Sequence, residues 1–143
     1  MTTRIAGTHD VLDKGTTYLH HAAELWALVD SRRGEAIHTW LRNEWAAHPE
    51  HPDLEVYDVA SLRHLLGLLA GLGDALVAKL TDASWRLDAE TAARLFASHP
   101  TLIDSWREGE GTVYTLANRV SEVDQIEALV RRAVALNRDL EVG

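Results

Sequence analysis

The stretch 62-LRHLLGLLAGLGDAL-76 is the most apolar part of this chain, and it carries three glycines. A membrane-spanning helix needs about 20 consecutive apolar residues. The charged residues Arg63, Asp74 and Lys79 leave a shorter run than that. We therefore interpret the stretch as part of a core helix in a globular protein. The spacing of its leucines is the main basis for the expected fold class.

Leucines recur in and after this stretch at spacings of three and four residues, which is the period of one helix face. This leucine face comprises Leu62, Leu65, Leu66, Leu69, Leu72, Leu76 and Leu80. The pattern predicts a helix from about Val56 to Leu80 with its leucine face buried. Truncation of Leu69 or Leu76 to alanine should then cost about 2–5 kcal/mol.

The opposite face of the same expected helix carries small residues, namely Gly67, Gly71, Asp74 and Ala78. A glycine inside an exposed helix costs about 1 kcal/mol relative to alanine. Small residues one turn apart allow another backbone to approach closely. We therefore expect a second helix to pass over this face, either from the same chain or from a second copy in a homodimer.

Helical spacing also dominates the preceding region, residues 10–47, where Ser31 and Gly34 interrupt the apolar stripe. Two interpretations stay open: a helix from near Asp10 followed by a second helix, or a single long helix with a kink at Gly34. The segment 48–53, HPEHPD, should end the region, because each proline disfavours helical geometry at the residue before it.

The rest of the chain predicts a short helix starting at Asp88 and a long C-terminal helix from Thr112 to about Leu140. No alternating run of β-branched residues extends beyond a few positions. The expected fold class is therefore all-α, a bundle of four or more helices with a long C-terminal helix. We expect one domain over residues 1–143, with residues 1–9 as a flexible tail.

Composition narrows the class of protein further. The chain has 143 residues, a formal net charge of -8 and no cysteine. The absence of cysteine removes disulfides, thiolate metal ligands and cysteine nucleophiles. An acidic chain without a basic stripe is not expected to bind nucleic acid. The sequence has no apolar N-terminal run typical of a signal peptide and no membrane segment, so a cytoplasmic location is expected.

Several histidines and glutamates have the types and spacings of metal ligands. His20 and Glu24 stand one helical turn apart, and Glu35 and His38 form a Glu-x-x-His motif. Carboxylate-bridged di-iron bundles need two such motifs, and the chain has one. A single divalent metal could be bound by His20, Glu24, His38 and His64. No spacing requires it, and solvated polar positions explain the same residues, so no cofactor is the favoured expectation.

Five tryptophans against one phenylalanine is a skewed choice of aromatic residues. Trp26, Trp40 and Trp45 fall in the first expected helical region. A tryptophan fills a core well and has one N–H that needs a partner, and a cluster of tryptophans can also line a ligand cleft. Core packing is the favoured interpretation, and a pocket wall formed by these three residues is the alternative.

No catalytic motif is present: the chain has no phosphate-binding loop, no Gly-x-Ser-x-Gly elbow and no His-Glu-x-x-His. The favoured prediction is therefore a small cytoplasmic interaction or regulatory module, homodimeric and without catalysis, whose partner is another protein or a second copy. The alternative is a helical-bundle protein or enzyme that binds a ligand or metal in a pocket lined by tryptophan and histidine.

Overall fold

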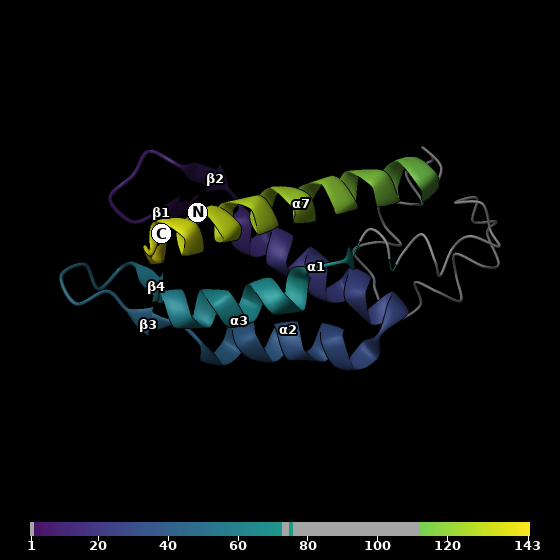
Figure 1. The fold of residues 1–143 in the computed structure, drawn as a ribbon, viewed down its shortest axis with the longest axis horizontal. Helices are drawn as coiled ribbons and strands as arrows, with labels where there is room; N and C mark the ends of the chain where they lie inside the picture. Colours follow the sequence, from purple (N-terminus) through teal and green to yellow (C-terminus); the bar gives the residue numbers. More distant parts are fainter. Residues whose placement is uncertain (1, 73–74, 76–111) are drawn as a thin grey trace.

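A computed structural model of the chain describes residues 2–72, 75 and 112–143, and within them it contains both helices and a β-sheet (Figure 1). The helices are α1 (Gly15–Val29), α2 (Ser31–Asn43), α3 (Val59–Leu69) and α7 (Thr112–Leu136). The strands are β1 (Thr2–Ile5), β2 (Val11–Asp13), β3 (Ala46–Ala47), β4 (Glu55–Tyr57) and β5 (Leu140–Val142).

The five strands form one antiparallel sheet in the order β2-β1-β5-β4-β3. The sheet lies at one end of the helices, where both chain termini also lie (Figure 1). The all-α fold class was therefore wrong, and the protein is mixed α and antiparallel β. Each strand is only 2–4 residues long, which is too short to produce a recognisable alternating pattern.

The N-terminal segment differs most from the expectation. Residues 1–9, expected to be a flexible tail, contain β1, which pairs with β2 on one side and with β5 on the other. Thr3 and Ile5 of β1 are buried. The helix expected from Asp10 begins only at Gly15, because Lys14 has a φ of 60° and separates β2 from α1.

The region 10–47 contains two helices and not one kinked helix. Asp30 ends α1 with an extended backbone, and its carboxylate accepts hydrogen bonds from the backbone N–H groups of Arg32 and Arg33. It is therefore an N-cap that starts α2 immediately after α1 ends. The two helices pack against each other, and Gly34 is buried at their contact.

The leucine face of α3 is buried as expected: Leu62, Leu65 and Leu69 are fully inaccessible to solvent. The helix is shorter than predicted, however. Asp58 caps its N-terminus by accepting a hydrogen bond from the Ser61 N–H, and the helix ends at Leu69. Leu76 lies outside the described residues, as does the helix expected from Asp88.

The long C-terminal helix α7 ends at Leu136, four residues earlier than predicted. Asn137 follows with a φ of 53°, and the N–H of Arg138 donates to the carbonyl of Ala133. This is a Schellman ending with asparagine in the left-handed position. It redirects the chain so that Leu140 and Val142 of β5 bury their side chains under the helices.

The buried core is formed by α1, α3 and α7, by Ile37 and Trp40 of α2, and by the inner residues of the sheet. No helix in the described part of the chain is both long enough and apolar enough to cross a membrane.

Candidate functional site

A cleft of about 500 Å³ opens where α1, α2 and strand β4 meet. Its size lies within the range of about 300–1,000 Å³ that small-molecule sites occupy. The cleft is lined by Thr16, His20, His38, Leu41, Arg42, Trp45, Glu55 and Tyr57. Aromatic, cationic and hydrogen-bonding groups thus converge on one hollow, which makes it the candidate functional site.

Two histidines form one wall of the cleft. His20 lies on α1 and His38 on α2, and their ring centroids are 6.0 Å apart. The close contact of α1 with α2 causes this proximity, because the connection at Asp30 folds the second helix back along the first. His20 is exposed and His38 is half-buried, so at least one imidazole is accessible to a ligand.

Arg42 and Trp45 extend the α2 wall of the cleft beyond His38, at and just after the C-terminal end of α2. Arg42 is exposed and donates a hydrogen bond of 3.3 Å to the hydroxyl of Thr39. No carboxylate among the described residues forms a salt bridge with it. The indole of Trp45 is 46 % exposed, which is unusual for such a large apolar group and leaves a ring face available for stacking.

The floor of the cleft is rigid. Tyr57 of β4 is buried and stacks on Trp40, with ring centroids 4.6 Å apart and an angle of 18° between the planes. The Trp40 indole N–H donates to the carbonyl of Ser61 at 2.9 Å. The Ser61 hydroxyl in turn donates to the carboxylate of Glu44 at 2.8 Å. These contacts connect β4, α2 and α3 below the cleft.

Tyr57 keeps its proton at neutral pH. Burial, the negative charge of Glu55 and a hydrogen bond to that carboxylate together raise the pKa of Tyr57 to about 12. The phenol therefore stays a hydrogen-bond donor whose acceptor is Glu55. This bond holds the single carboxylate of the cleft against its floor, while the cationic and imidazole groups line its walls.

The four residues expected as metal ligands are only partly brought together. His20 and His38 face each other in the cleft, whereas His64 on α3 lines a separate hollow beside α2. Glu24 is half-buried on α1 and does not line the cleft. Within residues 2–72, 75 and 112–143, no group of three histidine, aspartate or glutamate side chains could hold a metal ion.

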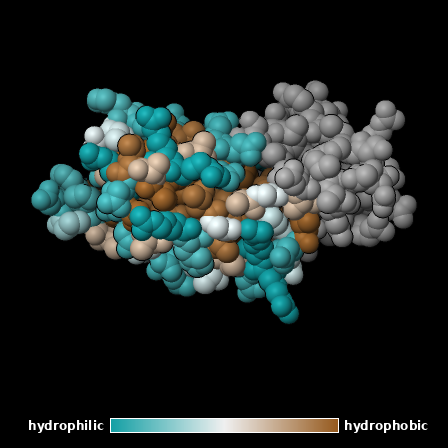
Figure 2. All heavy atoms as spheres, viewed as in Figure 1, coloured by the Kyte–Doolittle hydropathy of each residue, from teal (hydrophilic) through white to brown (hydrophobic). Residues whose placement is uncertain are grey.

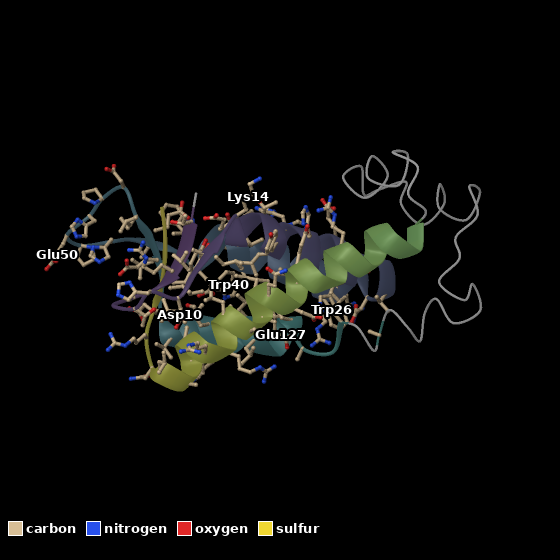
Figure 3. All side chains as sticks on the ribbon, turned by 90° about the horizontal axis from the view of Figure 1, so that it is seen from above. Asp10, Lys14, Trp26, Trp40, Glu50 and Glu127 are labelled. Carbon is tan, nitrogen blue, oxygen red and sulfur yellow. The ribbon has the colours of Figure 1, made fainter. Side chains whose placement is uncertain are left out.

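The three tryptophans of the expected pocket lie in three different environments, and Figure 3 shows Trp26 and Trp40 at separate points along the helices. Trp26 is buried, and the guanidinium carbon of Arg33 lies 4.0 Å from its ring centroid. Trp40 is part of the core stack. Trp45 alone lines the cleft with the two histidines.

The small-residue face is placed differently from the expectation. Gly67 is exposed, and Gly71 lies beyond the end of α3. A Cβ atom built on either glycine would meet no atom of the described residues within 4 Å. Within the described part of the chain, no helix passes over these two glycines. Asp74 and Ala78 lie outside the described residues.

A second polar cluster connects α1 to α7. The Nδ1 atom of His21 lies 2.6 Å from Oε2 of Glu122, and Nη1 of Arg119 lies 3.1 Å from both carboxylate oxygens of Glu122. His21 is buried, and none of the described clefts is lined by these three residues. The cluster therefore joins α1 to α7 through charged hydrogen bonds.

Sequence reasoning identified His20, His38 and Trp45 but missed the rest of the cleft. Arg42, Glu55 and Tyr57 have no motif around them, and Glu55 and Tyr57 reach the cleft only because β4 joins the sheet. The alternation of apolar and polar residues in strand β4 is too short to read without its partners. Comparison with protein-family models, with curated proteins and with solved structures gives no match to this chain.

Proposed function

We propose that the protein binds a small aromatic carboxylate in the cleft between α1, α2 and β4. The observation that carries the proposal is the convergence of Arg42, the paired His20 and His38, and the exposed Trp45 on one hollow of about 500 Å³. A guanidinium and imidazole N–H groups bind carboxylates through charge-assisted hydrogen bonds. An accessible indole binds the flat apolar part of such a ligand by stacking.

The charge distribution of the cleft supports an anionic ligand. Glu55 already accepts a hydrogen bond from Tyr57, and the buried stack of Tyr57 on Trp40 keeps that pair at the floor. Among the polar groups on the walls, the Arg42 guanidinium has only donors, and each imidazole has at least one N–H donor. We therefore place the carboxylate of the ligand at Arg42 and its ring against Trp45.

The test uses two ligands of the same shape and opposite charge, benzoate and benzamidine, with indole-3-acetate as a larger aromatic acid. Binding is followed by two-dimensional NMR through the indole N–H signal of Trp45, and affinities are measured by calorimetry. The proposal expects saturable shifts with both acids and none with benzamidine. Preference for benzamidine would indicate that Glu55 dominates the site and would contradict the proposal.

Variants locate the binding groups. Arg42→Gln should weaken the binding of benzoate about tenfold or more, since a hydrogen bond to a charged group contributes about 1.5–3 kcal/mol. Arg63→Gln is the matched control, because Arg63 is exposed on α3 and does not line the cleft. Equal affinities for the two variants would place the carboxylate elsewhere.

The favoured expectation from the sequence was an interaction module whose seam contained Gly67 and Gly71. Within the described part of the chain, no atom lies within 4 Å of a Cβ atom built on either glycine, and the seam at Gly67 and Gly71 stays a prediction. A different surface, at the edge strand β2, has stronger physical features for an interaction.

A further inference from the structure

Strand β2 is an edge of the sheet, and no backbone group of the described residues pairs with its outer side. Ile5 donates a backbone hydrogen bond to the carbonyl of Asp10, and Thr3 lies opposite Leu12 in the β1–β2 pair. Because bonded and non-bonded positions alternate in an antiparallel ladder, the N–H and C=O groups of Val11 and Asp13 point to the open edge. Such an edge is a template for another strand.

Beside this edge, the last turns of α7 carry four apolar residues, which we call the α7 stripe: Ala128, Leu129, Ala135 and Leu136. They alternate with Gln125, Arg131 and Arg132, and Leu129 also packs against the core. The buried face of α7 consists of Val123, Ile126, Val130 and Ala133. A groove of about 600 Å³ runs between the outer face of α7 and β2, and it is lined by Val11, Leu12, Gln125, Ala128, Leu129, Arg131, Arg132 and Ala135. Figure 2 shows hydrophobic residues over the half of α7 that lies next to the sheet, with hydrophilic residues around them.

Two large apolar side chains, one on β2 and one on α7, are exposed. Val11 is 46 % exposed and Leu136 at the end of α7 is 45 % exposed. A helix that faces the core on one side is normally polar on the other, and monomeric proteins rarely expose contiguous apolar patches that serve no contact. The edge strand and the stripe adjoin each other, so one partner can cover both.

We propose that a second copy of this chain covers this surface, with β2 of each copy paired antiparallel about a two-fold axis through Leu12. In this register Leu12 faces Leu12 of the second copy, and Val11 faces Asp13. The hydrogen-bonding groups of Val11 and Asp13 are those that point to the open edge, so backbone bonds form at this pair without any change of the strand.

Charge complementarity favours this register. It brings Asp10 of one copy near Lys14 of the other, at both ends of the paired strands. Asp10 precedes β2 and Lys14 follows it, so the two residues stand at opposite ends of the strand. Asp10 also holds Arg132 of α7, with Nε of the arginine 2.7 Å from its carboxylate. The acidic end of the strand is thereby connected to the apolar stripe on the helix.

The strand pairing alone is too small to hold a dimer, because stable interfaces bury about 1,200–2,000 Å² in total. The two-fold axis that extends an antiparallel sheet keeps the helices of both copies on the same side of it. The α7 helices then lie next to each other, and Ala128, Leu129 and Leu136 supply the apolar contact. The proposal is independent of the cleft at Arg42.

The first measurement is the mass of the full-length chain by light scattering over about a hundredfold range of concentration. We expect the mass to rise toward twice 15.9 kDa. A monomer at every concentration would overturn the proposal.

Two substitutions at one position test the register. Val11→Asp places two acids opposite each other at both symmetric pairs, and it should raise the dissociation constant of the dimer about tenfold relative to Val11→Lys, which places a lysine opposite Asp13. The double variant Val11→Asp with Asp13→Lys should restore the affinity. Equal dissociation constants for Val11→Asp and Val11→Lys would overturn the proposed register.

A second matched pair tests the stripe without altering the strand. Ala128→Glu places a charge in the groove, whereas Ala60→Glu adds the same charge to an exposed position of α3. The first variant should be monomeric at concentrations where the second remains dimeric, with equal circular dichroism spectra for both. If both dissociate to the same extent, the α7 stripe is not the interface.

Discussion

Two glycines on helices, Gly34 of α2 and Gly67 of α3, look alike in the sequence and have opposite surroundings in the structure. A Cβ atom on Gly34 would lie 2.6 Å from the carbonyl oxygen of Ala23 and 2.8 Å from the Cβ of Ala27. A Cβ atom on Gly67 would meet no atom of the described residues within 4 Å. Within this part of the chain, a close approach of two helices is therefore found at Gly34.

A small residue allows another backbone to come close, but it does not by itself bring that backbone there. Gly34 lies directly after the cap at Asp30, so the chain reversal forces α2 onto α1 and the glycine permits the short distance. Gly67 lies on a helix whose leucine face alone is covered. The helix geometry of each segment is the same, and only its neighbours differ.

Arg33 connects the two regions. Its guanidinium donates to the carbonyl oxygens of Leu68 at 2.9 Å and Gly67 at 2.6 Å, and it lies over the ring of Trp26. Carbonyl groups in the last turn of a helix have no partner within the helix. The arginine beside Gly34 therefore satisfies the end of the helix that carries Gly67.

The largest effect is expected for Gly34→Ala. The added methyl group would collide with backbone atoms of α1 that cannot move without separating the helices, so the cost should reach the upper end of about 1–3 kcal/mol. Urea unfolding measures the change. A free energy of unfolding equal to that of the wild type would mean that α1 and α2 are farther apart than described.

Arg33→Ala should follow, with a loss of about 2 kcal/mol, because charged hydrogen bonds to two carbonyls and the contact with Trp26 are removed together. Arg33→Lys is the matched variant: it keeps the charge but lacks the planar fork that reaches both oxygens. The melting temperature of Arg33→Lys should lie between those of the wild type and Arg33→Ala. Full stability of the lysine variant would contradict the role assigned to the fork.

Gly71→Ala should lower the free energy of unfolding by about 1–2 kcal/mol because of backbone strain and not because of a steric clash. Gly71 has a φ of 86° where the chain leaves α3, and a side chain with a Cβ atom is strained in that conformation. There is space for the methyl group, so Gly71→Asn should cost less than Gly71→Ala, since asparagine tolerates positive φ. The reverse order, measured by chemical unfolding, would count against this explanation.

The smallest effect, with the opposite sign, is expected for Gly67→Ala. Alanine favours the helix by about 0.5–1 kcal/mol where nothing is displaced, so the melting temperature should rise slightly. The same substitution thus has opposite signs at Gly34 and Gly67. A clear loss of stability at Gly67, concentration-dependent in a melting series, would instead support a contact between copies at this glycine.

Helices could be predicted well because their signal is local. The buried leucine face of α3, the break near Ser31 and the long C-terminal helix all follow from spacings of three and four residues within one segment. Trp45, His20 and His38 could also be singled out from the sequence as candidate site residues. Polar and aromatic residues on consecutive helices can be recognised without knowledge of the residues that they contact.

The sheet could not be predicted, because the signal that joins its strands is not local. Strand β5 of three residues pairs with β1, and Arg4 lies opposite Glu141 in that pair. Strands β1 and β2 pair locally, as do β3 and β4, and only the pairing of β5 with β1 and β4 joins them into one sheet across distant segments. No single strand has enough length to show the period of two. The same holds for Glu55 and Tyr57, which become part of the cleft through that pairing.

The sequence by itself determined where helices form and which face of α3 is buried, because those properties depend on the spacing of apolar residues within one segment. Only the tertiary structure decided that both chain ends pair as strands, that Gly34 lies in close contact with α1, and that Arg42, Glu55 and Tyr57 meet the histidines. These outcomes depend on contacts between distant segments, whose free energies arise from packing and hydrogen bonds that exist only once the chain is folded.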